Sequence, residues 1–344
     1  MGRSTAYPAM PALPADVVVF GEALVDMFPE QPGTPLEEAE RFVRHLGGAP
    51  TNLAVGLARQ GVKTALCSMV GNDAFGRFVH RALQDEGVDV DTVLPHKTAR
   101  TGVTFVATAG TARSFLFYRH PSADMLITPQ HVDEKPQHVR RGRIFHFGSS
   151  TLSREPCRSA TLRALELAKQ PRTGKLVSCD VNLRQHLWSE IKEAPPLLRK
   201  LLADCDIVKL VPEELPILFG TERVEEAAAK VRQLGATIVV VTLGESGCYL
   251  DCPSGQSYFA AEPVRVVDTT GAGDAFCAGL LAGLLSQLGG PGPDDLRQRL
   301  RALSAAQVKR AVQRGNHLGA LCCTAVGATT ALPRAVADAA NAKK

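Results

Sequence analysis

The chain contains 344 residues, of which 45% are hydrophobic and 22% charged, and its formal net charge is +4. These proportions are ordinary for a globular protein and exclude a disordered chain, a collagen and a coiled coil. So small a positive excess gives no reason to expect a nucleic-acid partner. No run of about 18 apolar residues occurs, so we expect no membrane span either.

The cysteines and the N-terminus together predict a cytoplasmic protein. The nine cysteines lie at irregular spacing without a C-x-x-C pair, and most of them fall within apolar runs. This pattern argues against a zinc site and is typical of reduced thiols in a protein core. Residues 1–14 lack the apolar stretch of a signal peptide, and we expect them to form a disordered tail.

Short apolar runs alternate with helical stretches along most of the chain. The runs predicted to form strands are 16–21, 64–70, 143–147, 175–180, 206–210 and 237–242. The predicted helices lie at about 50–60, 73–86, 155–169, 194–203 and 223–234. This alternation predicts an α/β fold whose parallel strands are joined by crossover helices on both faces of the sheet.

Residues 101–118 interrupt this alternation with two β-rich runs, 101–107 and 114–118, that flank a turn. They predict an inserted hairpin. Its alternating aromatic residues predict one apolar face that covers a ligand pocket or a partner subunit: Phe105, Phe115 and Phe117. The alternative is a hairpin that merely extends the main sheet.

The most informative stretch is 264–276. It predicts a strand that ends at Val267, then a glycine-rich turn, then a helix that begins near Gly273. Backbone N–H groups at such a helix start bind anions. An Asp there repels an anion, so we interpret Asp274 as a general base, the alternative being an ordinary first-turn acid. Farther on, 288–300 predicts a loop between two long helices.

The heptapeptide at 268–274 resembles a signature of the ribokinase-like (PfkB) carbohydrate kinases, and 47–52 resembles their other signature. With further matches, the resemblance covers about 16–335. It implies a three-layer α/β/α sandwich with a mostly parallel central sheet and a small β-sheet lid. We expect the domain at 15–338, with the lid built from about 24–45 and 98–120.

The family resemblance implies that ATP donates a phosphoryl group to a sugar hydroxyl. Asp274 is then the base, Gly271, Ala272 and Gly273 form the anion hole, and Arg184 stabilises phosphoryl charge or holds an acidic substrate. The expected sugar-binding residues are Asp26, Gly47, Gly48, Asn52, Arg119 and Asp274. Asn52 could instead cap a helix.

The resemblance also implies nucleotide and metal sites. The expected nucleotide-binding residues are Asn182, Lys209, Thr242, Gly244, Gly247, Gly271, Gly273, Asn316 and Gly319. Glu214 is the expected water-mediated ligand of Mg²⁺, although Val211 stands where the family usually has Asn. Asp268 and Thr270 resemble ligands of a K⁺ site found in some members.

The longer matches, at 117–126, 145–148 and 155–160, resemble fructokinases, which implies conversion of D-fructose to fructose 6-phosphate. The alternative is a 2-keto-3-deoxygluconate kinase, which the run at 180–188 and the lid arginine also resemble, and Tyr118 beside Arg119 offers a hydroxyl to an acidic substrate. A second alternative is a sugar-binding regulator without catalysis. A dinucleotide oxidoreductase is disfavoured, because 271–276 lacks the third glycine of that fingerprint. The apolar hairpin predicts a homodimer formed through the lid.

Overall fold

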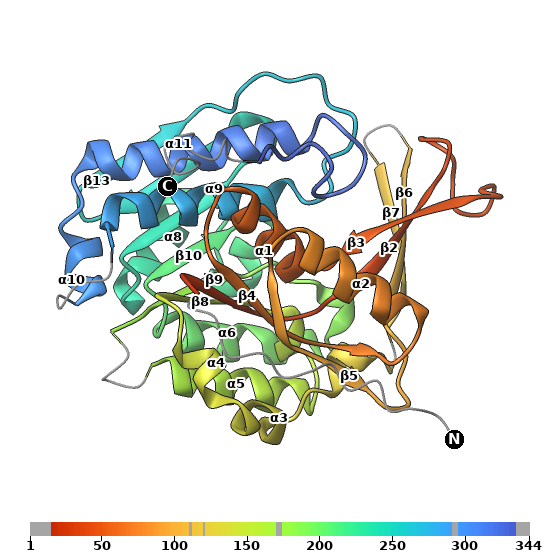
Figure 1. Cartoon of the computed structure of the whole chain (residues 1–344). Helices are drawn as coiled ribbons and strands as arrows, with labels where there is room; N and C mark the ends of the chain where they lie inside the picture. Colours follow the sequence, from red (N-terminus) through yellow and green to blue (C-terminus); the bar gives the residue numbers. More distant parts are fainter. Residues whose placement is uncertain (1–14, 110–111, 120, 170–173, 291–294, 335–344) are drawn as a thin grey trace, which may run out of the picture.

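The computed structural model describes residues 15–109, 112–119, 121–169, 174–290 and 295–334, so the tail predicted at 1–14 lies outside it. Within these residues the largest element is a nine-stranded sheet (Figure 1). Its strands, in spatial order, are β13 (Gly255–Phe259), β12 (Cys248–Cys252), β11 (Ile238–Thr242), β10 (Ile207–Leu210), β9 (Leu176–Asp180), β8 (Ile144–Gly148), β1 (Val17–Phe20), β4 (Thr64–Gly71) and β5 (Asp89–His96). Only the pairs that involve β12 are antiparallel within this sheet.

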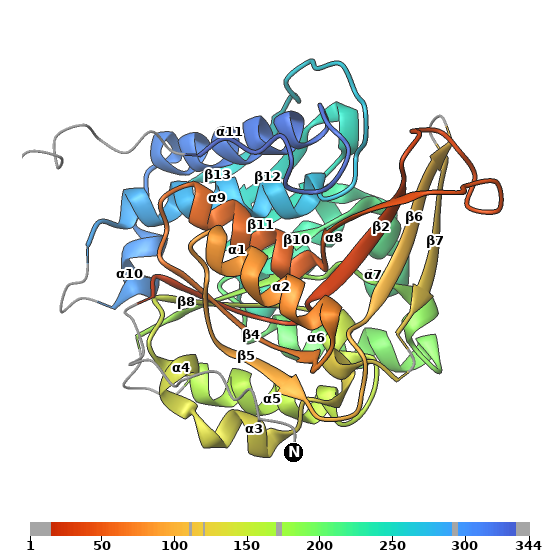
Figure 2. The same cartoon turned by 45° about the vertical axis from the view of Figure 1, so that its right-hand side comes forward.

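Helices cover both faces of this sheet, as Figures 1 and 2 show. One face carries α3 (Pro129–Glu134), α4 (Pro136–Arg140), α5 (Cys157–Ala168), α6 (Ala194–Leu202), α7 (Leu215–Phe219) and α8 (Val224–Leu234). The other face carries α1 (Ala49–Arg59), α2 (Ala74–Asp85), α9 (Ala272–Leu288), α10 (Leu296–Arg301) and α11 (Ala305–Cys322). The predicted three-layer α/β/α sandwich is therefore confirmed.

Strand β11 shows why the sequence builds three layers. Its side chains alternate between the two cores: Val239 and Val241 join one hydrophobic cluster, while Ile238 and Val240 join the other. A strand that is apolar at every position can bury both of its faces only between two layers of helices.

A second, four-stranded sheet forms the lid, at the right of Figure 1. Its order is β3 (Phe42–Gly47), β2 (Leu24–Pro29), β6 (Val103–Ala109) and β7 (Ala112–Tyr118). Strands β6 and β7 form the predicted antiparallel hairpin. Because β6 pairs with β2 and neither hairpin strand belongs to the nine-stranded sheet, the alternative of an extended main sheet is wrong.

The predicted apolar face of the hairpin holds for Phe115 and Phe117 but not for Phe105, because the register puts Phe105 on the opposite side. Phe105 lies opposite Leu116, whereas Phe115 lies opposite Val106. Phe115 and Phe117 therefore line the inner side, while Phe105 packs edge-on against Tyr118 on the outer side. A one-residue difference in register moves a side chain to the other face.

Two further predictions need correction. Residues 264–267 form no strand; Val267 N–H instead donates to Cys323 O at 2.8 Å, which ties this extended segment to the loop after α11. The loop predicted at 288–300 contains the start of α10, where the Asp295 side chain accepts from Arg297 N–H at 3.0 Å and Leu300 is buried. None of the helices in the described part of the chain is long and apolar enough to cross a membrane.

Candidate active site

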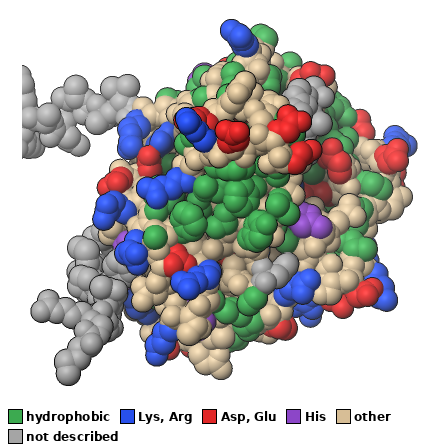
Figure 3. All heavy atoms as spheres, turned by 90° about the vertical axis from the view of Figure 1, so that its right-hand side faces the viewer, with side chains coloured by type: hydrophobic (Ala, Val, Ile, Leu, Met, Phe, Trp, Pro, Cys, Tyr) green, Lys and Arg blue, Asp and Glu red, His purple; other side chains and the backbone are tan. Residues whose placement is uncertain are grey.

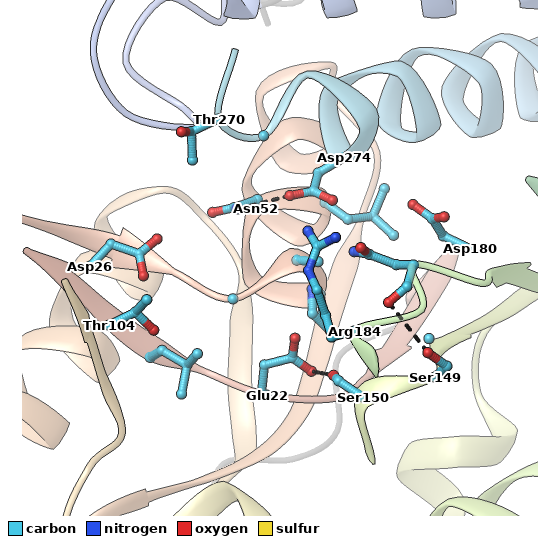
Figure 4. Close-up of a pocket in the computed structure, with 18 of the residues that line it drawn as sticks. Glu22, Asp26, Asn52, Thr104, Ser149, Ser150, Asp180, Arg184, Thr270 and Asp274 are labelled. Carbon is cyan, nitrogen blue, oxygen red and sulfur yellow. Dashed lines mark hydrogen bonds between the residues drawn. The ribbon is translucent and has the colours of Figure 1, made fainter. Parts of the chain in front are cut away.

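A cavity of about 120 Å³ lies between the lid sheet and the carboxyl ends of the central strands. Strand β9 delivers Asp180 to it, α9 delivers Asp274, α1 delivers Asn52 and the lid delivers Asp26 and Thr104 (Figure 4). Ligand sites of open α/β sheets lie at this edge, because the loops that follow the strands converge there.

Asp274 lies in the first turn of α9 and is buried. Asn52 Nδ2 donates to Asp274 Oδ2 at 2.8 Å, so the Asn52 side chain reaches across the pocket. The N-cap residue of α1 is Gly48, so Asn52 does not cap that helix. Burial raises the pKa of Asp274 to about 7, against the opposing effect of the Asn52 hydrogen bond. A carboxylate with a pKa near neutrality suits general-base chemistry.

The turn before α9 depends on its glycines. Gly271 has a φ of 79°, and a Cβ atom there would lie 2.3 Å from Ala328 Cβ. Ala272, the first residue of α9, donates its N–H to Thr269 O at 3.2 Å, and the first N–H groups of a helix have no carbonyl partner within that helix. The turn that the sequence predicted to bind an anion therefore lies at the start of α9, beside Asp274.

Lys209 forms a buried ion pair beneath this turn. Its Nζ lies 3.0 and 3.1 Å from the two Asp180 carboxylate oxygens, and a Cβ atom on Gly273 would lie 2.9 Å from it. Burial alone would lower the pKa of Lys209, but Asp180, together with Cys277 and Glu214, outweighs burial and raises it. Lys209 is thus charged and already paired with Asp180 beneath the start of α9.

Asp26 reaches the pocket from β2. A Cβ atom on Gly47 would lie 2.3 Å from its carboxyl group, so only a glycine at position 47 leaves room for that carboxyl. Gly48 has a φ of 95°, and a Cβ atom there would lie 2.6 Å from Glu22 O. Burial and the nearby Asp274 raise the pKa of Asp26 to about 8.

Arg119, predicted as the lid arginine, lines the same pocket but is 3% exposed and ion-paired with Asp124. Asp124 also accepts from Ser122 Oγ at 2.6 Å. The charge of Arg119 is therefore balanced within the protein. The second predicted cation, Arg184, lines the pocket without such a pair in Figure 4, where its guanidinium points toward Asp274.

Sequence reasoning missed several polar residues of this pocket. Glu22 is buried, and its Oε2 accepts from Ser150 Oγ at 2.5 Å. Thr104 is buried on the inner side of β6. Asp180, the last residue of β9, lines the pocket as well. The alternation of β2 and β6 could have placed Thr104 beside Asp26, but only once their register was known.

The other predicted nucleotide-binding residues lie outside this pocket, except Asn182, which lines it. Thr242 ends β11, and the loop after it has positive φ at Gly244 (59°) and Gly247 (96°). Asn316, on α11, donates to Ala260 O at 3.1 Å. A Cβ atom on Gly319 would lie 3.3 Å from Ala272 O, so α11 runs beside the start of α9.

The predicted metal ligands are occupied by the protein itself. Glu214 accepts from Leu183 N–H at 2.7 Å and from Val211 N–H at 2.9 Å, and its burial raises its pKa to about 7. Asp268 accepts from the backbone and hydroxyl of Thr270 and from Gly327 N–H. The described residues include no cluster of three or more His, Cys, Asp or Glu side chains that could hold a metal.

Comparisons with known proteins agree with this geometry. The pfkB family carbohydrate kinase model matches residues 14–335. Fructokinase-1 of Oryza sativa subsp. japonica is 39% identical over 93% of this chain and 95% of its own length, and Fructokinase-1 of Zea mays is 37% identical over 92% and 94%. Among solved structures, the fructokinase of Vibrio cholerae O395 in its fructose-, ADP- and calcium-bound form has a TM-score of 0.78 at 33% identity and covers 93% of this chain and 96% of its own.

The aminoimidazole riboside kinase of Salmonella enterica, complexed with aminoimidazole riboside and an ATP analogue, has a TM-score of 0.76 at 32% identity, over 92% of this chain and 96% of its own. The matches thus extend over nearly the whole chain and include both the central sheet and the lid. The chain belongs to the pfkB family of carbohydrate kinases.

Proposed function

We propose that this chain is a fructokinase that transfers the γ-phosphoryl group of ATP to D-fructose and yields fructose 6-phosphate and ADP. The observation that carries the proposal is the buried Asp274 at the start of α9, held by Asn52 and faced by Arg184 across one pocket. Fructokinases at 34–39% identity over most of the chain support the substrate.

In the proposed reaction Asp274 takes the proton of the C6 hydroxyl as that oxygen attacks the γ-phosphorus. The new O–P bond forms while the bond to the β-phosphate oxygen breaks, and ADP leaves. N–H groups at the start of α9 and the Arg184 guanidinium stabilise charge on the transferred group. Lys209 contributes a fixed positive charge beneath Gly273, with Asp180 holding it in position.

The pocket favours a neutral ketose over 2-keto-3-deoxygluconate. Tyr118, which would have served an acidic substrate, is 62% exposed and lies on the outer side of the lid. On the inner side stands Phe117, which has no hydroxyl. Arg119 is neutralised by Asp124, while Glu22 adds a further carboxyl group to the pocket.

ATP is proposed to lie along the loop after β11 and the adjoining side of α11, where Gly244, Gly247, Asn316 and Gly319 are found. Mg²⁺ is expected to enter with the nucleotide, held by phosphate oxygens and water, because this ion keeps several waters when bound. Asp268 and Thr270 order a buried loop that we propose as a K⁺ site. The Vibrio cholerae fructokinase double mutant with fructose, ADP and potassium ion supports this last point by analogy.

The lid is the proposed dimer contact. It exposes large apolar side chains, namely Val43, Phe115, Leu116 and Tyr118, and Figure 3 shows a broad apolar area on this side of the molecule, bordered by charged residues. Such patches mark interaction surfaces. Eight of the nine cysteines are buried, as reduced core thiols commonly are, which supports a reducing compartment such as the cytoplasm.

A substrate panel tests the proposed function. The purified chain is given ATP and Mg²⁺ with fructose, 2-keto-3-deoxygluconate, ribose or glucose, and ADP release is measured. We expect the highest kcat/KM with fructose. A higher value with 2-keto-3-deoxygluconate would contradict the substrate assignment, and sugar binding without ADP release from any sugar would favour the non-catalytic regulator.

A further inference from the structure

The sugar pocket contains polar atoms that the protein leaves without partners. Among the described residues that line it, three buried side-chain atoms have no hydrogen-bond partner: Asn52 Oδ1, Thr104 Oγ1 and Arg119 Nε. A buried polar atom without a partner is costly, so one that belongs to a pocket-lining residue is a candidate for a hydrogen bond to a ligand. Asn52 and Arg119 have proposed roles at the sugar, whereas Thr104 has none.

Thr104 occupies a distinctive place on the lid. It is 3% exposed, and the register puts it opposite Asp26 on one side and Phe117 on the other. Its inner-side neighbours on the hairpin, Val106 and Phe115, are apolar. Figure 4 shows Thr104 beside Asp26, both directed toward the centre of the pocket. The Thr104 hydroxyl is thus a single polar group on an otherwise apolar stretch of wall.

Packing alone does not explain a threonine at this position. Valine has nearly the same shape, fits a β-strand equally well and would leave no hydroxyl without a partner. A hydroxyl group both donates and accepts hydrogen bonds, as the hydroxyls of a sugar do. The feature that distinguishes threonine from valine here is therefore a hydroxyl group that can hydrogen-bond a ligand in the pocket.

We propose that Thr104 is a specificity-determining residue whose Oγ1 hydrogen-bonds one hydroxyl of the bound sugar, next to the hydroxyl held by Asp26. The inference rests on the proposed function, because it names a contact made by the acceptor sugar. This hydrogen bond would favour ketoses that carry the hydroxyl over analogues that lack it. Thr104 takes no part in the phosphoryl transfer itself.

The test uses Thr104→Val, which removes the hydroxyl, and Thr104→Ser, which keeps it. A matched control is Thr237→Val, because Thr237 Oγ1 is also buried without a partner but lies outside the pocket. We expect Thr104→Val to lower kcat/KM for fructose about tenfold with the KM for ATP unchanged, as for one lost hydrogen bond. Thr104→Ser and Thr237→Val should both stay within about threefold of the unsubstituted chain.

A set of monodeoxy fructoses then locates the contact. One analogue should lose about tenfold in kcat/KM with the unsubstituted chain but nothing further with Thr104→Val, because the same hydrogen bond is already absent. Unchanged fructose kinetics in Thr104→Val, or additive losses with every analogue, would overturn the inference. If the unsubstituted chain does not phosphorylate fructose, the proposed function fails separately, and the same ratios are measured with deoxy analogues of the sugar that it does accept.

Discussion

Lys209→Met removes one partner of the buried ion pair beneath α9. Lys209 and Asp180 have side chains only 5% and 7% exposed, so the substitution leaves the Asp180 carboxylate buried without its counter-charge. Loss of one member of such a pair costs about 3–5 kcal/mol of unfolding free energy. The double variant Lys209→Met/Asp180→Asn has no charge at either position. We expect it to lose about 1–3 kcal/mol of unfolding free energy, because the new amide is buried without a hydrogen-bond partner.

Urea unfolding of the single and double variants measures these free energies. The pH dependence of kcat/KM supplies a second measurement, because Lys209 lowers the pKa of Asp274 and Asp180 raises it. Lys209→Met should therefore move the pH midpoint upward, and Asp180→Asn should move it downward. A loss below about 1 kcal/mol in Lys209→Met, or equal midpoints in both variants, would refute the role assigned to the pair.

Four further outcomes follow from the site. Because burial holds the pKa of Asp274 near 7, kcat/KM should rise between pH 6 and 8, and a flat profile would exclude this base. Arg119→Lys should raise the KM for fructose about tenfold but that for ATP less than twofold, because lysine lacks the guanidinium fork; equal changes would disprove a sugar contact. Gly271→Ala should lower the free energy of unfolding, measured in urea, by more than about 2 kcal/mol. Gly244→Ala should lower it by about 1 kcal/mol, because Gly244 also has a positive φ but a Cβ atom there would meet no other atom. Leu116→Glu on the exposed lid should give a monomer by sedimentation; a monomeric unsubstituted chain would disprove the dimer.

The sequence was sufficient for the parts of the fold that depend on local pattern. The fully apolar run of β11 indicates a strand buried on both faces, and the glycines before α9 indicate an anion-binding turn. Each of these features lies within a few consecutive residues. The positive φ of Gly271 and the burial of Asp274 then agree with the sequence-based interpretation.

Features that depend on partners distant in the chain could not be predicted. The sequence predicts that Phe105 and Phe115 lie on one face of the hairpin, whereas the β6–β7 register places them on opposite faces. The sequence does not show that Lys209 is ion-paired, because its partner Asp180 lies 29 positions away and becomes a neighbour only through the pairing of β9 with β10. The sequence likewise does not show that Arg119 is ion-paired, because only the turn after β7 brings Asp124 into contact with it.

The central claim is that Asp274 activates a hydroxyl of fructose. Asp274→Asn preserves the shape of the side chain but cannot accept a proton, and loss of a general base costs about 10²- to 10⁴-fold in rate. Formation of fructose 6-phosphate from fructose and ATP, with ATP binding measured in parallel, is the most direct test. We predict a fall in kcat within this range with ATP affinity unchanged. Equal turnover by Asp274→Asn and the unsubstituted chain would contradict the account.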